Sequence, residues 1–230
     1  MWLVVHVPKT AGTSFRHALE QYFGPDNVIR DYGRNAAATT EVVRNHLYKP
    51  GQARPLDELV QELSGCSRKV LVGHFPASKY GEFFEPQKMI SFVRDPLIRT
   101  CSEFMHRKRN TTFDGSFSEF ISTSSMINVQ SRFLRGIPVE SMVGLTERYC
   151  ESLKYINETF QLELRAMKRN IGKKGGGQKL AENLSGHELE LFHKLNGEDL
   201  ELYKSATQRF DDLKIPKSKG NQFMNWWNGR

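Results

Sequence analysis

Short apolar runs, separated by longer amphipathic stretches, set the pattern of this chain. Residues 2–7, 69–73 and 88–93 are rich in β-branched and other large apolar side chains and have the length of buried strands. A shorter run at residues 142–145 predicts a further strand. Strands that are apolar on both faces are typical of parallel sheets covered by helices. The pattern therefore predicts an α/β fold of three layers, with a mostly parallel central sheet flanked by helices.

Helices are predicted where apolar residues recur at intervals of three and four. The first helix is expected directly after residue 14, and its apolar positions are Phe15, Leu19, Tyr22 and Phe23. Another is expected after the last strand, opened by Thr146 as its capping residue. Its apolar face consists of Tyr149, Leu153 and Ile156. Further helices are expected at about 186–194 and 197–213.

The segments between these elements are less regular. Residues 32–54 are polar and rich in Asn, Ala and Arg, which predicts a loop or an irregular helical excursion. Residues 170–178 contain three consecutive glycines and are expected to form a mobile loop. The basic and aromatic tail at 217–230 is read either as a frayed end or as a segment that stacks on a sugar or a partner. Without an internal repeat or a low-complexity linker, residues 1–230 are interpreted as a single domain.

Charge and composition narrow the function classes. The 230 residues carry a formal net charge of +7, which suits a polyanionic ligand but also describes an ordinary solvated basic surface. No motif that interleaves basic and aromatic residues indicates nucleic acid. No run approaches the roughly 20 apolar residues of a membrane span, and residues 2–7 are too few for a signal peptide. Three widely separated cysteines fit a reducing compartment, so a soluble, cytoplasmic chain is expected.

The clearest chemical signal follows the first strand, where the chain reads Lys9, Thr10, Ala11, Gly12, Thr13, Ser14. A strand, a loop of small residues and a helix, in that order, direct backbone N–H groups at one point, and Lys9 adds a positive charge. Hydroxyl groups of this loop can cap the helix or donate to oxyanions. We therefore predict a phosphate-binding loop; the alternative is a plain strand–turn–helix whose hydroxyls only cap. In NTPases the motif GxxxxGK(S/T) places lysine after the second glycine, whereas Lys9 comes before the glycine of this loop.

A second anion site is predicted after the third strand. Arg94 follows that strand, and Pro96 favours the start of a helix. Arg99 and Ser102 lie three residues apart on one face of this helix, where guanidinium and hydroxyl groups can hold a phosphate. The alternative is an ion pair between Asp95 and Arg99 with Arg94 solvated. Carboxyl ends of parallel strands share one edge of the sheet, so the two sites together suit a nucleotide with phosphates at separated positions.

Residues 6–13 (HVPKTAGT) and residues 94–102 (RDPLIRTCS), in this order and spacing, resemble motifs of the sulfotransferase superfamily. The branch they resemble contains the heparan sulfate 2-O- and 6-O-sulfotransferases and bacterial carbohydrate sulfotransferases. The similarity continues through residues 128–134, 143–148 and 199–203. It implies a P-loop-like fold and 3′-phosphoadenosine 5′-phosphosulfate (PAPS) as co-substrate. In such a protein residues 9–14 bind the 5′-phosphosulfate, and Arg94 and Ser102 bind the 3′-phosphate.

The reaction that this resemblance implies is transfer of a sulfuryl group to a hydroxyl, on a glycan or glycoconjugate. A cation is needed at the leaving oxygen, which Lys9 can supply, and a base is needed for the acceptor proton. His74 follows the strand at 69–73, lies near both anion sites, and matches the position of the proposed base in related glycan sulfotransferases. The alternative is a histidine that only shapes the turn at Pro76. His6 is expected to be packed within the first strand.

Other features leave alternatives open. Arg132 could bind an acidic acceptor or buttress the sheet, and the segment 172–178 could close over the nucleotide or stay solvated. No HExxH motif or Cys/His cluster indicates a metal ion, and none is expected. Two competing functions are a P-loop nucleotide kinase, which would need Mg²⁺ ligands and the standard loop order, and a non-catalytic nucleotide- or polyanion-binding module.

Overall fold

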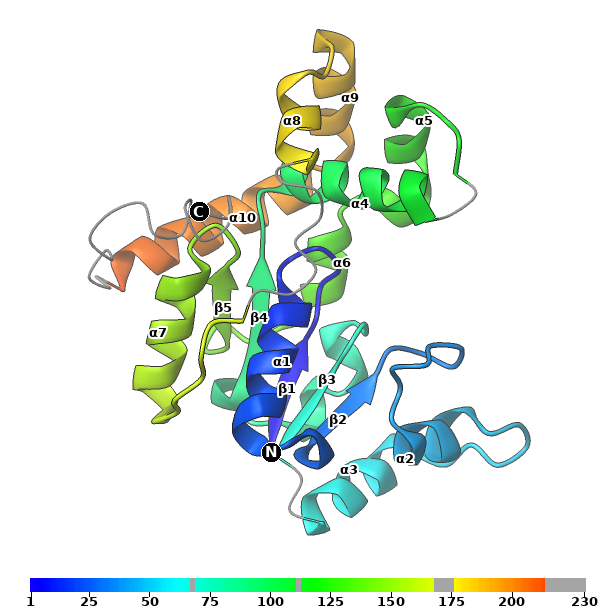
Figure 1. Ribbon diagram of the computed structural model, residues 1–230, viewed down its shortest axis with the longest axis vertical. Coiled ribbons are helices and arrows are strands. Elements are labelled where there is room, and N and C mark those ends of the chain that lie inside the picture. Colours follow the sequence, from blue (N-terminus) through cyan, green and yellow to red (C-terminus); the bar gives the residue numbers. More distant parts are fainter. Residues whose placement is uncertain (67–68, 111–112, 168–175, 214–230) are drawn as a thin grey trace.

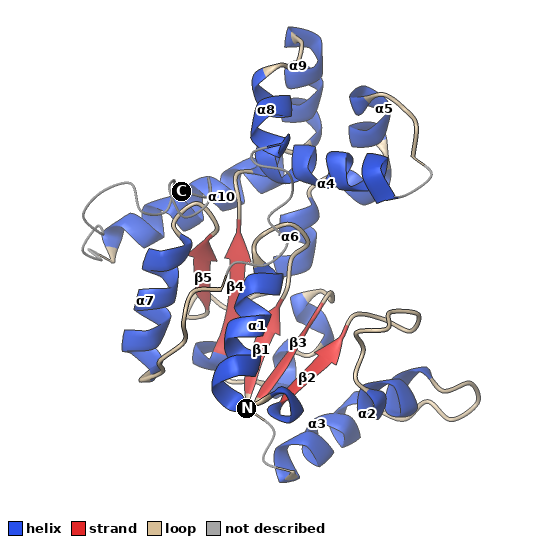
Figure 2. Ribbon diagram, viewed as in Figure 1, coloured by secondary structure: helices blue, strands red, loops and turns tan. Residues whose placement is uncertain are grey.

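The computed structural model describes residues 1–66, 69–110, 113–167 and 176–213. Its centre is a five-stranded sheet in the order β2-β3-β1-β4-β5, and each strand pair is parallel. The strands are β1 Trp2–Val5, β2 Val28–Asp31, β3 Val70–Gly73, β4 Met89–Val93 and β5 Met142–Leu145. Helices surround this sheet, as Figure 2 shows, so the predicted α/β class is confirmed. Strand β2 is an addition to the predicted set.

Burial of the strands explains why they form. The side chains of β3 from Val70 to Val72 are fully buried, and Leu3 of β1 pairs with Leu71 on one side and with Met89 on the other. A central strand with apolar residues on both faces loses water from each face when helices cover the sheet, which is the main source of its stability. The order of strands puts β1 between β3 and β4, so their carboxyl ends are neighbours.

Ten α-helical segments surround the sheet in the described part of the chain. They are α1 Gly12–Phe23, α2 Glu41–Val43, α3 Leu56–Gly65, α4 Pro96–Asn110, α5 Phe117–Ser122, α6 Val129–Leu134, α7 Tyr149–Phe160, α8 Gly176–Glu182, α9 Gly186–Leu195 and α10 Gly197–Asp212. In Figure 1, α1 lies in front of β1, while α4, α5, α8 and α9 stand beyond the carboxyl ends of the strands. This group of helices therefore rises over the edge at which both anion sites are predicted.

The helices beyond the sheet have an apolar core of their own. Its buried members are Cys101, Phe104, Phe117, Phe120, Ile121, Met126 and Phe192. The ring of Phe104 on α4 lies 5.5 Å from that of Phe117 and 5.3 Å from that of Phe120, centroid to centroid, in edge-to-face arrangements. Helix α4 starts at the sheet and continues into this second core, so it belongs to both.

Several local predictions are confirmed and others are wrong. Residues 32–54 contain the short α2 and a π-helical turn at Arg44–Tyr48, in agreement with an irregular helical excursion. Of the predicted glycine loop, residues 176–178 instead begin helix α8; residues 170–175 lie outside the described residues, as does the tail at 217–230. Tyr22, predicted on the apolar face of α1, is 42% exposed.

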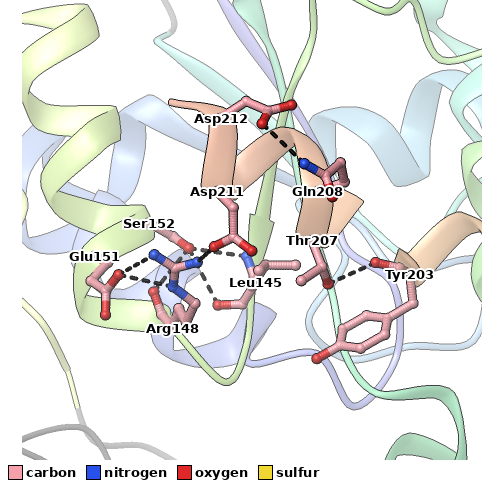
Figure 3. Close-up of polar contacts among 9 residues, drawn as sticks. All are labelled: Leu145, Arg148, Glu151, Ser152, Tyr203, Thr207, Gln208, Asp211 and Asp212. Carbon is pink, nitrogen blue, oxygen red and sulfur yellow. Dashed lines mark hydrogen bonds and ion pairs between the residues drawn. The ribbon is translucent and has the colours of Figure 1, made fainter. Parts of the chain in front are cut away.

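The start of α7 corrects the prediction for Thr146. The helix begins at Tyr149, and the Thr146 hydroxyl is buried without a hydrogen-bond partner among the described residues. Arg148 organises this end instead: it donates to Glu151 at 2.8 and 2.6 Å and pairs with Asp211 at the end of α10 (Figure 3). The guanidinium group of Arg148 thereby joins α7 to α10.

Candidate active site at the carboxyl edge of the sheet

The structure brings the predicted site residues to one edge of the sheet. Lys9 lies in the loop after β1, His74 directly follows β3, and Arg94 directly follows β4. Because β1 lies between β3 and β4, His74 and Arg94 come from the strands on either side of the Lys9 loop. Open parallel sheets bind ligands at such a point, outside the carboxyl ends of adjacent strands.

The backbone of the loop takes an unusual course. Lys9 and Ala11 both have left-handed conformations, with φ of 70° and 64°, which non-glycine residues adopt only where the surroundings enforce them. The Thr10 hydroxyl donates to the Val7 carbonyl at 2.8 Å and thereby closes the turn. Thr10 therefore stabilises the loop and does not cap the helix.

Helix α1 starts without a side-chain cap. Ala11 is its N-cap, and the first intrahelical bond runs from the Phe15 amide to the Ala11 carbonyl, 3.1 Å. The amides of Gly12 and Thr13 lie in the first turn, where no helical carbonyl can accept them. A helix N-terminus with free amides and the helix dipole behind it favours anions, and the binding of a phosphate here stays a prediction.

Lys9, in the loop before this helix, is half-buried. Its ammonium group makes no hydrogen bond or ion pair with the described residues. Burial lowers the pKa of Lys9 and the nearby Arg94 lowers it further, while Glu103 of α4 acts in the opposite direction. A cation in these surroundings is stabilised when an anion binds beside it.

Arg94 joins the two predicted anion sites. Its backbone is held in both directions by the side-chain amide of Gln130, at 2.8 and 2.9 Å, and its Nη1 donates to the Lys9 carbonyl at 3.3 Å. Burial lowers the pKa of Arg94, and Glu147, whose Oε1 lies 3.9 Å from Nε, raises it. The side chain is 9% exposed, so the alternative of a solvated Arg94 is wrong.

The residues of α4 are arranged differently from the prediction. Asp95 accepts from the Ile98 amide at 2.9 Å and thus caps α4; it forms no ion pair with Arg99. Arg99 is 1% exposed, and its Nη2 donates to the Thr100 hydroxyl at 2.9 Å, so its side chain is part of the protein interior and not of the helix surface.

Ser102 is half-buried on α4 beneath the start of α8. A Cβ atom at Gly177 would lie 3.1 Å from the Ser102 amide nitrogen, so the first turn of α8 packs directly on this turn of α4. Arg94 directly follows β4, and Ser102 lies on α4, the helix that comes next. Their joint role at a 3′-phosphate stays a prediction.

His74 lies in a group of aromatic rings. Its ring centroid is 4.4 Å from that of His6 and 4.7 Å from that of Tyr32, and its amide donates to the Asp31 carbonyl at 3.0 Å. Part of His74 is exposed to solvent. The neighbouring groups bury the rest of the ring, and this burial lowers the pKa of His74 to about 4. At pH 7 the imidazole is therefore neutral and able to accept a proton.

A second lysine near this edge, Lys79, is bonded to a buried carboxylate. Asp31, at the end of β2, is 1% exposed and accepts hydrogen bonds from Lys79 at 2.6 Å and from Tyr80 at 2.7 Å. Tyr48 donates to its other oxygen at 2.8 Å and accepts from Lys79 at 2.9 Å. We call these four residues the Asp31 cluster. Every polar group in it has a partner within the protein.

Reasoning from the sequence missed two residues of this region. Tyr32 follows β2, and it could have been found only if the short strand at Val28–Asp31 had been recognised. Glu103 lies on α4, about two turns after Pro96, and accepts a hydrogen bond from Arg107 at 2.9 Å. Its charge opposes the lowering of the pKa of Lys9 and of His74 by burial. Arg132 binds the carbonyls of Ser124 and Ser125, at 3.1 and 2.7 Å, and so holds a surface turn.

Other candidate sites are not supported in the described ranges. No group of three or more His, Cys, Asp and Glu side chains that could hold a metal ion occurs there, and metal independence stays a prediction. None of the helices in these ranges is both long and apolar enough to cross a membrane. A shallow concavity lined by Met142, Tyr155 and Phe210 lies at the amino end of β5, away from the edge that carries His74.

Fold and geometry together define an α/β protein that brings Lys9, His74 and Arg94 to the carboxyl edge of a parallel sheet. Models of known protein families give no match to the sequence, and no curated protein matches it. Among solved structures, the fold is similar to the crystal structure of a sulfotransferase from Alicyclobacillus acidocaldarius. The TM-score is 0.44 and the identity 13%, and the match covers 88% of this chain and 98% of the other. The α/β class rests on the sheet itself.

Proposed function

We propose that this protein is a PAPS-dependent sulfotransferase that transfers a sulfuryl group to a hydroxyl of a glycan or glycoconjugate. The observation that carries the proposal is the direct link between its two anion sites. Arg94, which follows β4, donates to the backbone of Lys9, which follows β1, at 3.3 Å. The linked loops therefore present two cations and a helix N-terminus beside a neutral histidine.

The donor fits the residues that are present. Lys9 and the first-turn amides of Gly12 and Thr13 would hold the 5′-phosphosulfate, and Arg94 and Ser102 the 3′-phosphate. The loop residues Thr10, Ala11 and Ser14 complete the cradle through their backbone. When bound, PAPS supplies an activated sulfuryl group whose transfer, like that of a phosphoryl group, passes through a loose in-line transition state.

Each side chain then has one task. His74 accepts the hydroxyl proton at a ring nitrogen while the acceptor oxygen attacks sulfur. Lys9 stabilises the negative charge that collects on the phosphate oxygen as the bond from that oxygen to sulfur breaks. His74, open to solvent on one side, afterwards releases the proton to water. The products are the sulfated acceptor and 3′-phosphoadenosine 5′-phosphate (PAP), and no electrons are exchanged.

The direct test compares nucleotides that differ by one phosphate. PAP should raise the melting temperature of the full chain by about 5–10 °C at a hundredfold excess over its dissociation constant. AMP, which lacks the 3′-phosphate, and ATP should each shift it far less. Equal shifts from all three nucleotides would refute a two-phosphate site and favour a general polyanion-binding module.

A matched pair of serine variants adds resolution to this test. Ser102→Ala should weaken PAP binding and leave AMP binding as it is, because only PAP carries the group that Ser102 is proposed to hold. Ser122, whose hydroxyl donates to the Ser118 carbonyl at 2.8 Å, is the control. Ser122→Ala should bind both nucleotides like the wild type. Loss of AMP affinity in Ser102→Ala would assign Ser102 a structural role.

A further inference from the structure

Three rings meet at neighbouring strand ends, and only one of them, that of His74, has a role in the proposed reaction. His6 follows β1, Tyr32 follows β2 and His74 follows β3. The His6 and His74 centroids are 4.4 Å apart, those of Tyr32 and His74 are 4.7 Å apart, and the Tyr32 hydroxyl lies 2.9 Å from Nδ1 of His6. The His74 imidazole is therefore held by two rings that are bonded to each other.

The opposite side of the His6 ring lies on the anion-binding loop. A Cβ atom at Gly12 would be 1.9 Å from Cδ2 of His6 and 2.3 Å from its Nε2. Gly12 does not have a positive φ, so the backbone conformation alone would allow other residues there. Glycine is required at this position because the His6 ring occupies the space of a side chain.

The surroundings of His6 and Tyr32 also determine their protonation states. Burial, His74 and Arg16 lower the pKa of His6 well below 6.5, and burial raises the pKa of Tyr32 to about 12. Both groups are neutral at pH 7. A neutral imidazole has one donor and one acceptor nitrogen, and its hydrogen-bond partner decides which is which. The Tyr32 hydroxyl can either donate to Nδ1 or accept from it. As the donor it puts the ring proton on Nε2, an atom that a Cβ at Gly12 would approach to 2.3 Å.

We propose that His6 is a positioning residue: held by the Tyr32 hydroxyl, its ring fixes the His74 imidazole and the first turn of α1 relative to each other. This inference rests on the proposed function, in which His74 acts on the acceptor and the first turn of α1 holds the donor. His6 itself touches neither reacting atom. It acts as a spacer that is in contact both with the base and with the first turn of α1.

The first experiment exploits the close approach of His6 and Gly12. PAP binding to the full chain is measured by calorimetry. Gly12→Ala should weaken binding about tenfold or more, because the new methyl group displaces the His6 ring and with it the loop. The double variant His6→Ala/Gly12→Ala should regain affinity to within about threefold of wild type, because the new methyl group then occupies part of the space that the ring filled and supports the first turn in its place. The control is Gly65→Ala in α3, where a Cβ atom meets nothing within 4 Å, and it should bind PAP normally.

A double variant that binds PAP as weakly as Gly12→Ala alone would overturn the proposal, because the ring would then not transmit the effect. A merely structural role of His6 would make the double variant weaker than either single one. Rescue is the result that the spacer arrangement requires.

The second experiment does not depend on any nucleotide. Nitrogen chemical shifts of the histidine side chains, measured by NMR on the full chain, report which nitrogen of His6 carries the proton. The wild type should show a single tautomer with the proton on Nε2. Tyr32→Phe should give a mixture of tautomers and shift the His74 resonances. Tyr48→Phe, which removes a comparable hydrogen bond to Asp31, should change neither.

An unchanged His6 tautomer in Tyr32→Phe would overturn the proposal. If the wild type failed to bind PAP, the proposed function would fall, and the nitrogen shifts would still decide whether Tyr32 controls His6. The two failures are therefore distinguishable.

Discussion

Two lysines at the same edge of the sheet have opposite surroundings. Lys79, in the Asp31 cluster, is bonded to a buried carboxylate at 2.6 Å, and although burial lowers the pKa of Lys79, its bonds to Asp31 and Tyr48 raise it overall. Lys9, in the anion loop, has no such partner among the described residues, and burial lowers the pKa of Lys9. The first cation stabilises the fold by itself. The second has, within the described ranges, no bonded carboxylate and only the longer-range attraction of Glu103, which fits its proposed role of holding a bound anion.

The largest effect is expected at His74, where a substitution should affect turnover but not PAP binding. His74→Ala should lower the turnover number by about 10²–10⁴-fold, because the acceptor proton loses its base. PAP affinity should stay within about twofold of wild type. Turnover is measured with radiolabelled PAPS and a hydroxyl acceptor that is first found by screening glycans with the same donor. Wild-type turnover in this variant would remove His74 from the mechanism.

The second prediction addresses the anion loop. Lys9→Ala should reduce turnover by about 10²–10³-fold, since the charge on the leaving oxygen is no longer stabilised. PAP binding should weaken as well, in contrast to His74→Ala. Kinetics and calorimetry on the same preparation show both effects. An unchanged rate would contradict the role at the leaving oxygen.

The third prediction is the counterpart in the Asp31 cluster. Lys79→Met should lower the free energy of unfolding by about 1–3 kcal/mol, because a hydrogen-bond donor of a buried carboxylate is lost. PAP affinity should stay at the wild-type value. Urea unfolding and calorimetry provide the two measurements. If Lys79→Met instead weakened PAP binding at full stability, the contrast between the two lysines would collapse.

The smallest expected effect is a dependence of stability on pH. Burial lowers the pKa of His6 well below 6.5 and that of His74 to about 4. Below pH 6.5 the unfolded chain binds protons that the folded protein does not, so the free energy of unfolding should fall from pH 7 to pH 5. Burial of His106 lowers its pKa and acts in the same direction.

The Asp31 cluster should not contribute in this window. Burial raises the pKa of Asp31, but bonds from Lys79 and Tyr80 outweigh it, so the net pKa lies below 3.8. The stability that Asp31 contributes is therefore present at pH 5 and is lost only as the pH falls through that lower value. Urea unfolding at pH 7 and pH 5 measures the slope, and His6→Phe should reduce it. A slope that is unaltered in His6→Phe would contradict the lowered pKa of His6.

The sequence predicted the frame of the fold because its buried strands are apolar. Strand β2 was not predicted because two of its four residues, Arg30 and Asp31, are polar. Their hydrogen-bond partners come from other parts of the chain: the Arg30 amide donates to Thr40 at 2.8 Å, and its guanidinium group donates to Glu20 at 2.9 Å. Helix α8 escaped because its glycines indicated flexibility, whereas Gly177 permits close packing on α4. The residues next to a glycine in the sequence do not show that it is needed for close packing against another helix.

Strand ends likewise determined how much of the site could be predicted. Lys9, His74 and Arg94 follow apolar runs directly, so their common edge was accessible to sequence reasoning. The orientation of Arg99 was not, because a residue four positions into a helix can face either the solvent or the helices packed against it. Tyr32 depends on the missed strand β2, and its bond to His6 joins residues 26 positions apart.

Helix α4 links the site to a distant part of the molecule. Its first turn follows Arg94, and its middle packs Phe104 into the second apolar core with α5 and α9. Because one helix belongs to both regions, we expect transient local opening of the outer core to disturb the proposed nucleotide site as well. Substitutions at Phe120, which touches no ligand, would thus lower affinity by populating open states. Hydrogen exchange at α5 should slow when PAP binds, which would make a remote helix a reporter of occupancy.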